Sequence, residues 1–453
     1  MKVPSIAIFD IGKTNKKLLL FDNSLRLISE YEERFPLIKD EDGFECDNIE
    51  LIEYWIKSSL LDIINSNEYD LKGVNFATYG ATVVYLDGQG KKLTPVYNYL
   101  KPVDPSIPDG LYKKYGGKEE FCRRTASPAL GMLNSGIQVL WLKKTRPDIF
   151  SKVKHILHLP QYLSYSLTGK FYSEPTSIGC HTALWDFDNM KYHPWIGDEH
   201  LNLPLPAAVN TCNEITLGGN KISVGVGIHD SSSSLAPYFK EEKFLLVSTG
   251  TWCITMNPFN SEKLTDEELA NDCLCYLSIN NMPVKSSRLF LGHLHEEGIK
   301  IISEYFKINE NGTRLIKPDL KLLNKLLAKF IDEKVFIIPD DPRRELRDEP
   351  DMFVFDNFIE AYHQLMVELA DLTIEAIHRV IPESDEANKI YITGGFARNA
   401  LFLKLIASSF PDKSVYTSEI NNATALGAAL VIHNVIFPDM KVDPELGLVE
   451  VRL

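Results

Sequence analysis

Cysteine is scarce and scattered in this chain. Seven cysteines occur among 453 residues, at positions 46, 122, 180, 212, 253, 273 and 275. An odd number without regular spacing indicates reduced thiols and argues against a disulfide framework. Two pairs of nearby histidines, at 155 and 158 and at 293 and 295, lack the cysteine or carboxylate partners that a structural zinc site requires. We therefore expect no transition-metal site.

Long hydrophobic runs and an excess of positive charge are also missing. The apolar stretch at the N-terminus meets Asp10 at once, so it is too short for the apolar region of a signal peptide and far too short to span a bilayer. The 48 Lys and Arg face 62 Asp and Glu, a formal net charge of -14. An acidic balance opposes binding to a phosphate backbone. We expect a cytoplasmic protein that binds neither membranes nor nucleic acids.

What the chain has is enough length for two hydrophobic cores, so we expect two domains with a ligand site in the cleft between them. Residues 5–9 and 17–21 are apolar runs around a polar turn, and residues 244–247 and 252–256 repeat this pattern. Each pair predicts a β-hairpin, and the two together indicate an internal duplication. A charged stretch at residues 239–243 predicts domains 1–240 and 241–453.

Helical and strand patterns alternate around these hairpins, which predicts an α/β fold. We expect helices at 49–64, 135–144, 357–380, 400–409 and 423–433, and strands at 74–78, 389–393 and 414–417. Alanine and glycine dominate the last helix and permit close approach of another backbone.

The first polar turn has groups suited to a metal-bound polyphosphate. Asp10 ends an apolar run and could hold Mg²⁺ through water, while Thr14, Asn15 and Lys17 after Gly12 could meet phosphate oxygens. The competing interpretation is an ordinary hairpin turn with solvated lysines. A P-loop is excluded because its first glycine would fall on residue 7, an alanine inside the strand, and no helix follows.

Two further turns predict nucleotide contacts. In the second hairpin, Gly250 admits close approach and Thr251 adds a hydroxyl donor for phosphates. Gly394 and Gly395 open a helix and could carry a nucleotide on bare backbone. Each has a competing interpretation, a plain tight turn for the first and a helix-packing turn for the second.

The remaining requirement is a base, and Asp230 follows a β-prone run among small residues that leave room for a substrate hydroxyl. Asp230 could instead only cap a helix that begins at Ser231. We assign the neighbouring His229 to packing and to the substrate side, not to the base.

Taken in order, these segments resemble the FGGY carbohydrate kinases, members of the actin-like ATPase superfold, over essentially the whole chain. The matching segments are DIGKTNKK at 10–17, LSYSLTGK at 163–170, GIHD at 227–230, STGTW at 248–252 and TGGFARN at 393–399. The resemblance implies two actin-like (ribonuclease H-like) domains with an ATP and sugar cleft between them, Mg²⁺ as cofactor and ATP as co-substrate. A homodimer is compatible with the sequence, which leaves the oligomeric state open.

The resemblance also implies residue roles. Asp10 would assist Mg²⁺ and the phosphates, and Asp230 would be the general base. Phosphate contacts would come from Gly12, Thr14, Asn15, Lys17, Gly250 and Thr251, nucleoside contacts from Gly394, Gly395 and Asn399, and sugar contacts from Tyr79, His229 and Asp230. Lys17 stands where many relatives carry arginine, which exchanges a planar fork for a point charge.

Within the family, the Gly-Thr-Trp turn at 250–252 and the segments at 338–342 and 350–352 look most like the rhamnulokinase and fuculokinase branch. This resemblance favours a 6-deoxy-ketohexose such as L-rhamnulose or L-fuculose. The segments at 79–82 and 97–101 depart from the sugar-side pattern of better-known members. A ketopentose kinase acting on xylulose or ribulose, and a non-catalytic sugar or nucleotide sensor, therefore remain as alternatives.

Overall fold

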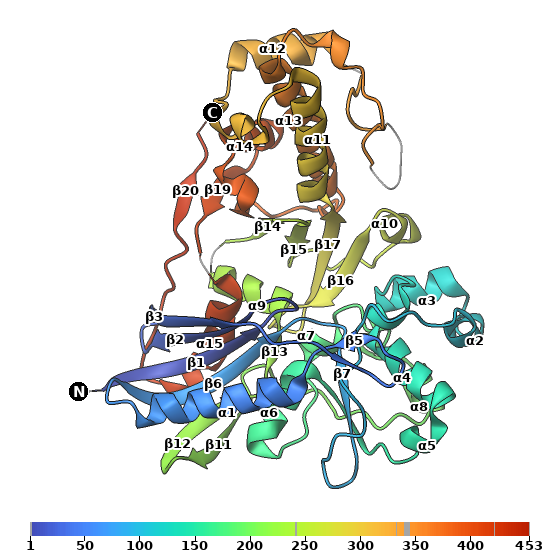
Figure 1. Cartoon of the computed structure of the whole chain (residues 1–453), viewed down its shortest axis with the longest axis vertical. Helices are drawn as coiled ribbons and strands as arrows, with labels where there is room; N and C mark the ends of the chain where they lie inside the picture. The colour runs from blue at the N-terminus through green and yellow to red at the C-terminus, as the bar shows by residue number, and fades with distance from the viewer. Residues whose placement is uncertain (1, 241, 332, 339–344, 421, 453) are drawn as a thin grey trace.

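The computed structural model describes residues 2–452 except 241, 332, 339–344 and 421. Part of the predicted domain boundary and most of the 338–342 segment thus lie outside the described residues. Two large mixed sheets dominate the fold, one in the first half of the chain and one in the second (Figure 1). The predicted α/β architecture is confirmed.

The first sheet has the order β11-β12-β6-β1-β2-β3, and β13 also pairs with β6. Its strands are β1 (Val3–Ile11), β2 (Lys16–Asp22), β3 (Leu27–Glu33), β6 (Tyr69–Thr78), β11 (Cys212–Leu217), β12 (Asn220–Gly225) and β13 (Ile228–His229). β1 forms the predicted antiparallel hairpin with β2 and runs parallel to β6 on its other side. The central strand β1 therefore ends at Ile11, where the polar turn that leads to β2 begins.

Helices cover both faces of this sheet, which explains why β1 is an unbroken apolar run. Alternate residues Ala7, Phe9 and Ile11 pack under α1 (Ile49–Asn65) and α6 (Leu159–Thr168). Ile6 and Ile8 point to the opposite face, toward α15 (Ala423–Ile436). The period of two along a strand sends these side chains to separate cores.

The last helix returns from the second half of the chain to the first sheet, and Figure 1 shows red α15 among the blue strands. A Cβ at Gly427 would lie 1.8 Å from the carbonyl oxygen of Ser233 in α9 (Asp230–Leu235). The side chain of Asn75 donates to the carbonyl oxygen of Ala428 at 2.9 Å. The small residues thus permit the close approach that the sequence predicts, against a partner that it did not identify.

The second sheet repeats the topology of the first, as the paired hairpins predict. Its order is β16-β17-β15-β14-β18-β19-β20. β14, like β1, forms a hairpin with the next strand and runs parallel to a later one, β18. The strands are β14 (Phe244–Thr249), β15 (Cys253–Asn257), β16 (Cys273–Leu277), β17 (Pro283–Leu289), β18 (Lys389–Gly394), β19 (Ser414–Ser418) and β20 (Leu448–Glu450).

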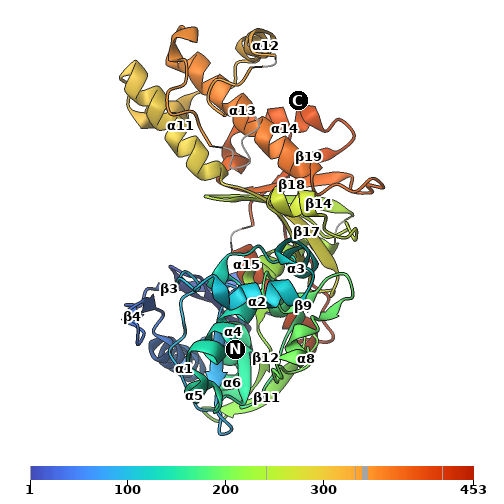
Figure 2. The ribbon, with the colours of Figure 1, turned by 90° about the vertical axis from the view of Figure 1, so that its right-hand side faces the viewer.

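Helices α11 (Leu291–Phe306), α13 (Phe358–His378) and α14 (Ala400–Ser409) pack on one face of this sheet, with α12 (Leu320–Lys329) farther out (Figure 2). The short helix α10 (Asp266–Ala270) lies beside β16 (Figure 1). The predicted helix at 357–380 is α13. No helix among the described residues is long and apolar enough to cross a membrane.

A largely helical insertion begins at β7 and packs around its own aromatic core, which includes Trp141 and Trp195. Its elements are β7 (Val83–Leu86), α2 (Ser106–Lys114), α3 (Lys118–Thr125), α4 (Ser135–Thr145), α5 (Pro147–Phe150), β8 (His155–His158), α7 (Pro175–Ile178), β9 (Trp185–Asp186), β10 (Lys191–Tyr192) and α8 (Trp195–Asp198), and the short strands β4 (Ile38–Lys39) and β5 (Glu45–Cys46) precede it. The predicted helix at 135–144 is α4, which ends before Pro147.

Candidate active site

Sheet register brings Asp10 and Asp230 to the same edge of the first sheet. β1 and β13 flank β6 and both run parallel to it. Asp10 and Ile228 both lie opposite Ala77, one residue before the strands end. Neighbouring strands lie about 4.8 Å apart, so the ends of β1 and β13, with β6 between them, are two strand spacings or roughly 10 Å apart.

The pKa of Asp10 is raised to about 7, first because the carboxyl is buried and next because Asp230 carries a like charge nearby. A divalent cation at this position would offset that repulsion. Carboxylate oxygens suit Mg²⁺, which usually takes one or two carboxylates and completes its shell with water and substrate phosphate. No cluster of three or more potential metal ligands occurs among the described residues. The single carboxylate of Asp10 would fit Mg²⁺ that takes its remaining ligands from water and substrate phosphate.

Asp230 keeps one carboxylate oxygen open. Its Oδ1 accepts the backbone N–H of Ser231 at 2.6 Å and lies 3.1 Å from Nε2 of His229. No residue that the structure describes donates a hydrogen bond to Oδ2. Burial lowers the pKa of His229, so the imidazole is neutral near pH 7. Asp230 is thus positioned through one oxygen and can accept a proton through the other.

A buried acid that the sequence did not suggest positions the backbone before Asp230. Glu174 has no exposed surface, and its carboxylate accepts the N–H groups of Thr176 and Ser177 at the start of α7. The Thr176 hydroxyl donates to Glu174 at 2.6 Å and accepts the backbone N–H of His229 at 3.0 Å. Two successive hydrogen bonds, through the Thr176 hydroxyl, therefore connect Glu174 to His229, the residue before Asp230.

Glu174→Ala should lower the catalytic rate although Glu174 does not touch the substrate. Removing the acceptor leaves two buried N–H groups unpaired, at a cost of about 1–3 kcal/mol each, and frees the Thr176 hydroxyl. We expect a lower melting temperature and a kcat about tenfold lower, with the KM for ATP unchanged. Glu174→Gln, which retains one acceptor oxygen, should lie between this variant and the wild type. Wild-type kcat in folded Glu174→Ala would show that α7 does not position Asp230.

The residues of the first turn point in different directions. A Cβ at Gly12 would lie 2.9 Å from the carbonyl oxygen of Asn15, so the turn is tight. Thr14 is exposed, and the Asn15 side chain accepts a hydrogen bond from Arg34. Lys17 pairs with Glu30 at 2.7 Å and donates to Asn422 at 3.2 Å. The predicted phosphate contact of Lys17 would therefore compete with an ion pair.

The second and third turns meet in one cavity of about 280 Å³. β14 and β18 are neighbouring parallel strands, and Thr249 lies opposite Gly394. The lining residues are Gly250, Thr251, Gly292, His295, Glu296, Gly395, Phe396 and Asn399. Four of the residues predicted for nucleotide binding thus share one space. His295, whose pKa is lowered by burial, lies edge-on to Phe396 and was not predicted.

Gly394 precedes the lining residue Gly395 and allows β18 to approach Thr249 closely. Its φ is +85°, and a Cβ would lie 1.7 Å from the carbonyl oxygen of Thr249, so no other residue fits. Asn399 caps α14 by accepting the N–H of Phe402 and donates to the Tyr362 hydroxyl. Its side chain is therefore used within the protein, although the residue lines the cavity.

Gly395→Val should raise the KM for ATP with little effect on sugar affinity. A Cβ at Gly395 would meet nothing within 4 Å, so the fold should accept valine while its side chain enters the cavity. Steric crowding of about 1–3 kcal/mol corresponds to roughly a 5- to 150-fold weaker affinity. Gly197→Val is the matched control, because a Cβ there also meets nothing within 4 Å and Gly197 lies in α8. An unchanged KM for ATP would move the adenosine site elsewhere.

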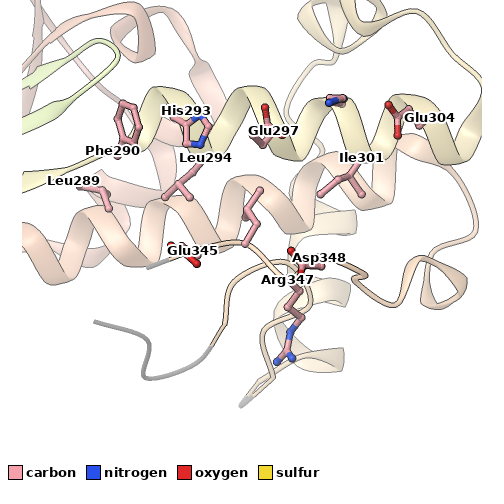
Figure 3. Close-up of a pocket in the computed structure, with 12 residues that line it drawn as sticks. Leu289, Phe290, His293, Leu294, Glu297, Ile301, Glu304, Glu345, Arg347 and Asp348 are labelled. Carbon is pink, nitrogen blue, oxygen red and sulfur yellow. The ribbon is translucent and has the colours of Figure 1, made fainter. Parts of the chain in front are cut away.

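A larger cavity of about 560 Å³ lies on another side of α11 (Figure 3). His293 and Leu294 line it with the end of β17, and His295 faces the smaller cavity. His293 and His295, which are close in the sequence, therefore line two different cavities. None of the residues predicted for catalysis or binding lines the larger cavity.

On the sugar side, Tyr79 is buried and its hydroxyl donates to Asp47 at 2.8 Å. Asp47 and its partner Lys13 were not predicted as site residues, because Asp47 lies outside the recognised segments and Lys13, although it lies in the segment at 10–17, was given no role. Gly80 packs against His229, since a Cβ at Gly80 would lie 3.1 Å from Nε2. The segment at 79–82 thus contacts His229, the residue before Asp230, even though it departs from the expected pattern.

Comparisons with known proteins agree with this architecture. Residues 5–204 match the model for the N-terminal domain of the FGGY family of carbohydrate kinases. The whole chain is similar in fold to a carbohydrate kinase from Novosphingobium aromaticivorans, with a TM-score of 0.81, 22% identity, and 100% of this chain and 94% of that chain covered. A xylulose kinase from Lactobacillus acidophilus has a TM-score of 0.79 and 15% identity, with 97% of this chain and 91% of that chain covered. A gluconate kinase from the same organism has a TM-score of 0.78 and 15% identity, with 98% of this chain and 91% of that chain covered.

Two repeated α/β units, each with a hairpin beside a parallel strand, give this chain the fold of solved carbohydrate kinases. Residues 5–204 are thus similar to the N-terminal domain of the FGGY family of carbohydrate kinases, and the whole chain has the fold of solved sugar kinases. Members of this family are sugar kinases that use ATP as co-substrate.

Proposed function

We propose that this kinase transfers the γ-phosphoryl group of ATP to a hydroxyl of a small ketose, with Asp230 as general base. The observation that carries the proposal is the placement of Asp10 and Asp230 at the ends of two parallel strands on either side of β6. One acid can serve the phosphate side and the other the acceptor side of an in-line transfer.

In this proposal, the free Oδ2 of Asp230 accepts the proton of the sugar hydroxyl as the sugar oxygen attacks the γ-phosphorus. Ser231 and His229 hold the other oxygen in place. Gly250 and Thr251 orient the phosphates, and Gly395 and Asn399 bind the nucleoside in the cavity of about 280 Å³, with Gly394 supporting the turn behind it. Bound Mg²⁺, held by Asp10, would supply charge compensation at the phosphates.

We propose a 6-deoxy-ketohexose, such as L-rhamnulose or L-fuculose, as the substrate. The Gly-Thr-Trp turn supports this choice, while the similarity in fold to a xylulose kinase supports a ketopentose as the second candidate. A coupled assay with Mg·ATP against L-rhamnulose, L-fuculose, D-xylulose and L-ribulose decides between them. The highest kcat/KM on a deoxyhexulose is the expected result, and the highest value on a pentulose would overturn it.

The two separate sheets support the proposed division into domains 1–240 and 241–453. Helix α15 is the exception, because it comes from the second half of the chain and packs on the first sheet. We also propose cytoplasmic residence. A non-catalytic sensor would bind ATP and sugar without transfer, so the same assay panel tests this alternative.

A further inference from the structure

A cluster of charged residues surrounds Asp47 beside the first turn. Lys13 Nζ lies 2.6 Å from Asp47 Oδ2, and Lys16 Nζ lies 3.0 Å from Oδ1. Burial alone would raise the pKa of Asp47, but the two lysines and the Tyr79 hydroxyl hold it below its usual value. The carboxylate is therefore ionised, and two ammonium groups against one carboxylate leave a surplus positive charge in an acidic protein.

The two lysines differ in exposure. The Lys16 side chain is 3% exposed and also donates to the carbonyl oxygen of Lys13, which is a structural arrangement. The Lys13 side chain is 26% exposed. Its ammonium lies 5.2 Å from the ring centre of Tyr79 and 5.4 Å from that of Tyr99. Lys13 therefore presents a charge to solvent between two aromatic rings.

This cluster adjoins the catalytic edge of the sheet. The backbone N–H of Tyr79 donates to the carbonyl oxygen of Ile11 at 3.2 Å, which joins the cluster to the end of β1. Burial raises the pKa of Tyr99, and the negative charges of Asp47 and Asp230 add to the rise. Ala81, two residues after Tyr79, has a φ of +57°, a strained value for a non-glycine residue and one that is concentrated at ligand sites.

We propose that Lys13 and Tyr99 contact the part of the sugar that does not react, and so determine which sugar is accepted, while the buried Asp47 holds the Lys13 ammonium in place. The ammonium can donate to sugar oxygens, and the half-buried Tyr99 ring can cover an apolar C–H face. This inference rests on the proposed function, because it places the rest of the substrate relative to Asp230.

Lys13→Met tests it, since methionine keeps the length of the side chain and removes the charge. L-rhamnulose and D-xylulose are the probes, each titrated separately by calorimetry and assayed with Mg·ATP. We expect the dissociation constant and KM of the accepted ketose to rise at least tenfold, because a hydrogen bond from a charged group is lost. The kcat and the KM for ATP should stay within about threefold.

Lys92→Met is the matched control. Lys92 is 21% exposed, pairs with Glu53 at 2.5 Å and lies 5.8 Å from the ring centre of Tyr162, so it has the same chemistry at the packing between α1 and α6. This variant should leave both ketose constants unchanged.

Wild-type ketose affinity in folded Lys13→Met overturns the inference, and so does a rise in the KM for ATP alone, which would assign Lys13 to the phosphates. If Lys13→Met does not fold, Tyr99→Leu replaces it and must weaken ketose binding by about tenfold. A Lys13→Met protein that binds ketose normally while Asp230→Asn abolishes transfer would refute this site and keep the kinase. A wild-type protein that binds ketose through Lys13 but transfers no phosphate would refute the proposed function instead.

Discussion

Asp230→Asn should lower kcat for phosphoryl transfer to the ketose by roughly 10²- to 10⁴-fold, the usual contribution of a general base. Asparagine keeps the size of aspartate and can still accept the N–H of Ser231 through its side-chain oxygen. Its amide cannot take the proton of the attacking hydroxyl. The loss should therefore fall on the chemical step.

Binding should largely survive this substitution. The dissociation constants of ATP and ketose should stay within about tenfold of the wild type, or roughly 1.4 kcal/mol. Calorimetry measures the binding, a single-turnover assay measures the transfer, and circular dichroism verifies the fold. Transfer at the wild-type rate would mean that Asp230 only begins α9, and the mechanism would be wrong.

Asp10→Ala should lower turnover by orders of magnitude and remove the benefit of added Mg²⁺, because the metal's charge compensation at the transferring phosphate depends on this carboxylate. A folded Asp10→Ala enzyme with normal turnover would contradict the role.

A pH series adds a second measurement to the same variant. With a pKa of about 7, Asp10 becomes increasingly ionised as the pH rises from 6 to 8. Metal ions bind the ionised carboxylate, so the apparent Mg²⁺ affinity of the wild type should strengthen across this window. The dependence should be weaker in Asp10→Ala. Equal slopes in the two proteins would assign the titration to another group.

Local sequence predicted the two hairpins, the alternation of helices and strands and the small-residue character of α15. These features depend on the period of the apolar residues and on glycine at turns, both of which act within a few positions of the chain. The order of short segments that resemble those of the FGGY kinases then predicted the family.

The sequence by itself determined the architecture of repeated hairpins and the residue types of the turns. Only the tertiary structure decided which distant side chains meet. Sheet register places Asp230 beside Asp10, the buried α7 joins Glu174 to His229, and loop packing sets Tyr99 over the ion pair of Lys13 with Asp47. Such contacts depend on strand pairing and burial across hundreds of residues, whereas a periodic pattern records only which face of its own element is apolar.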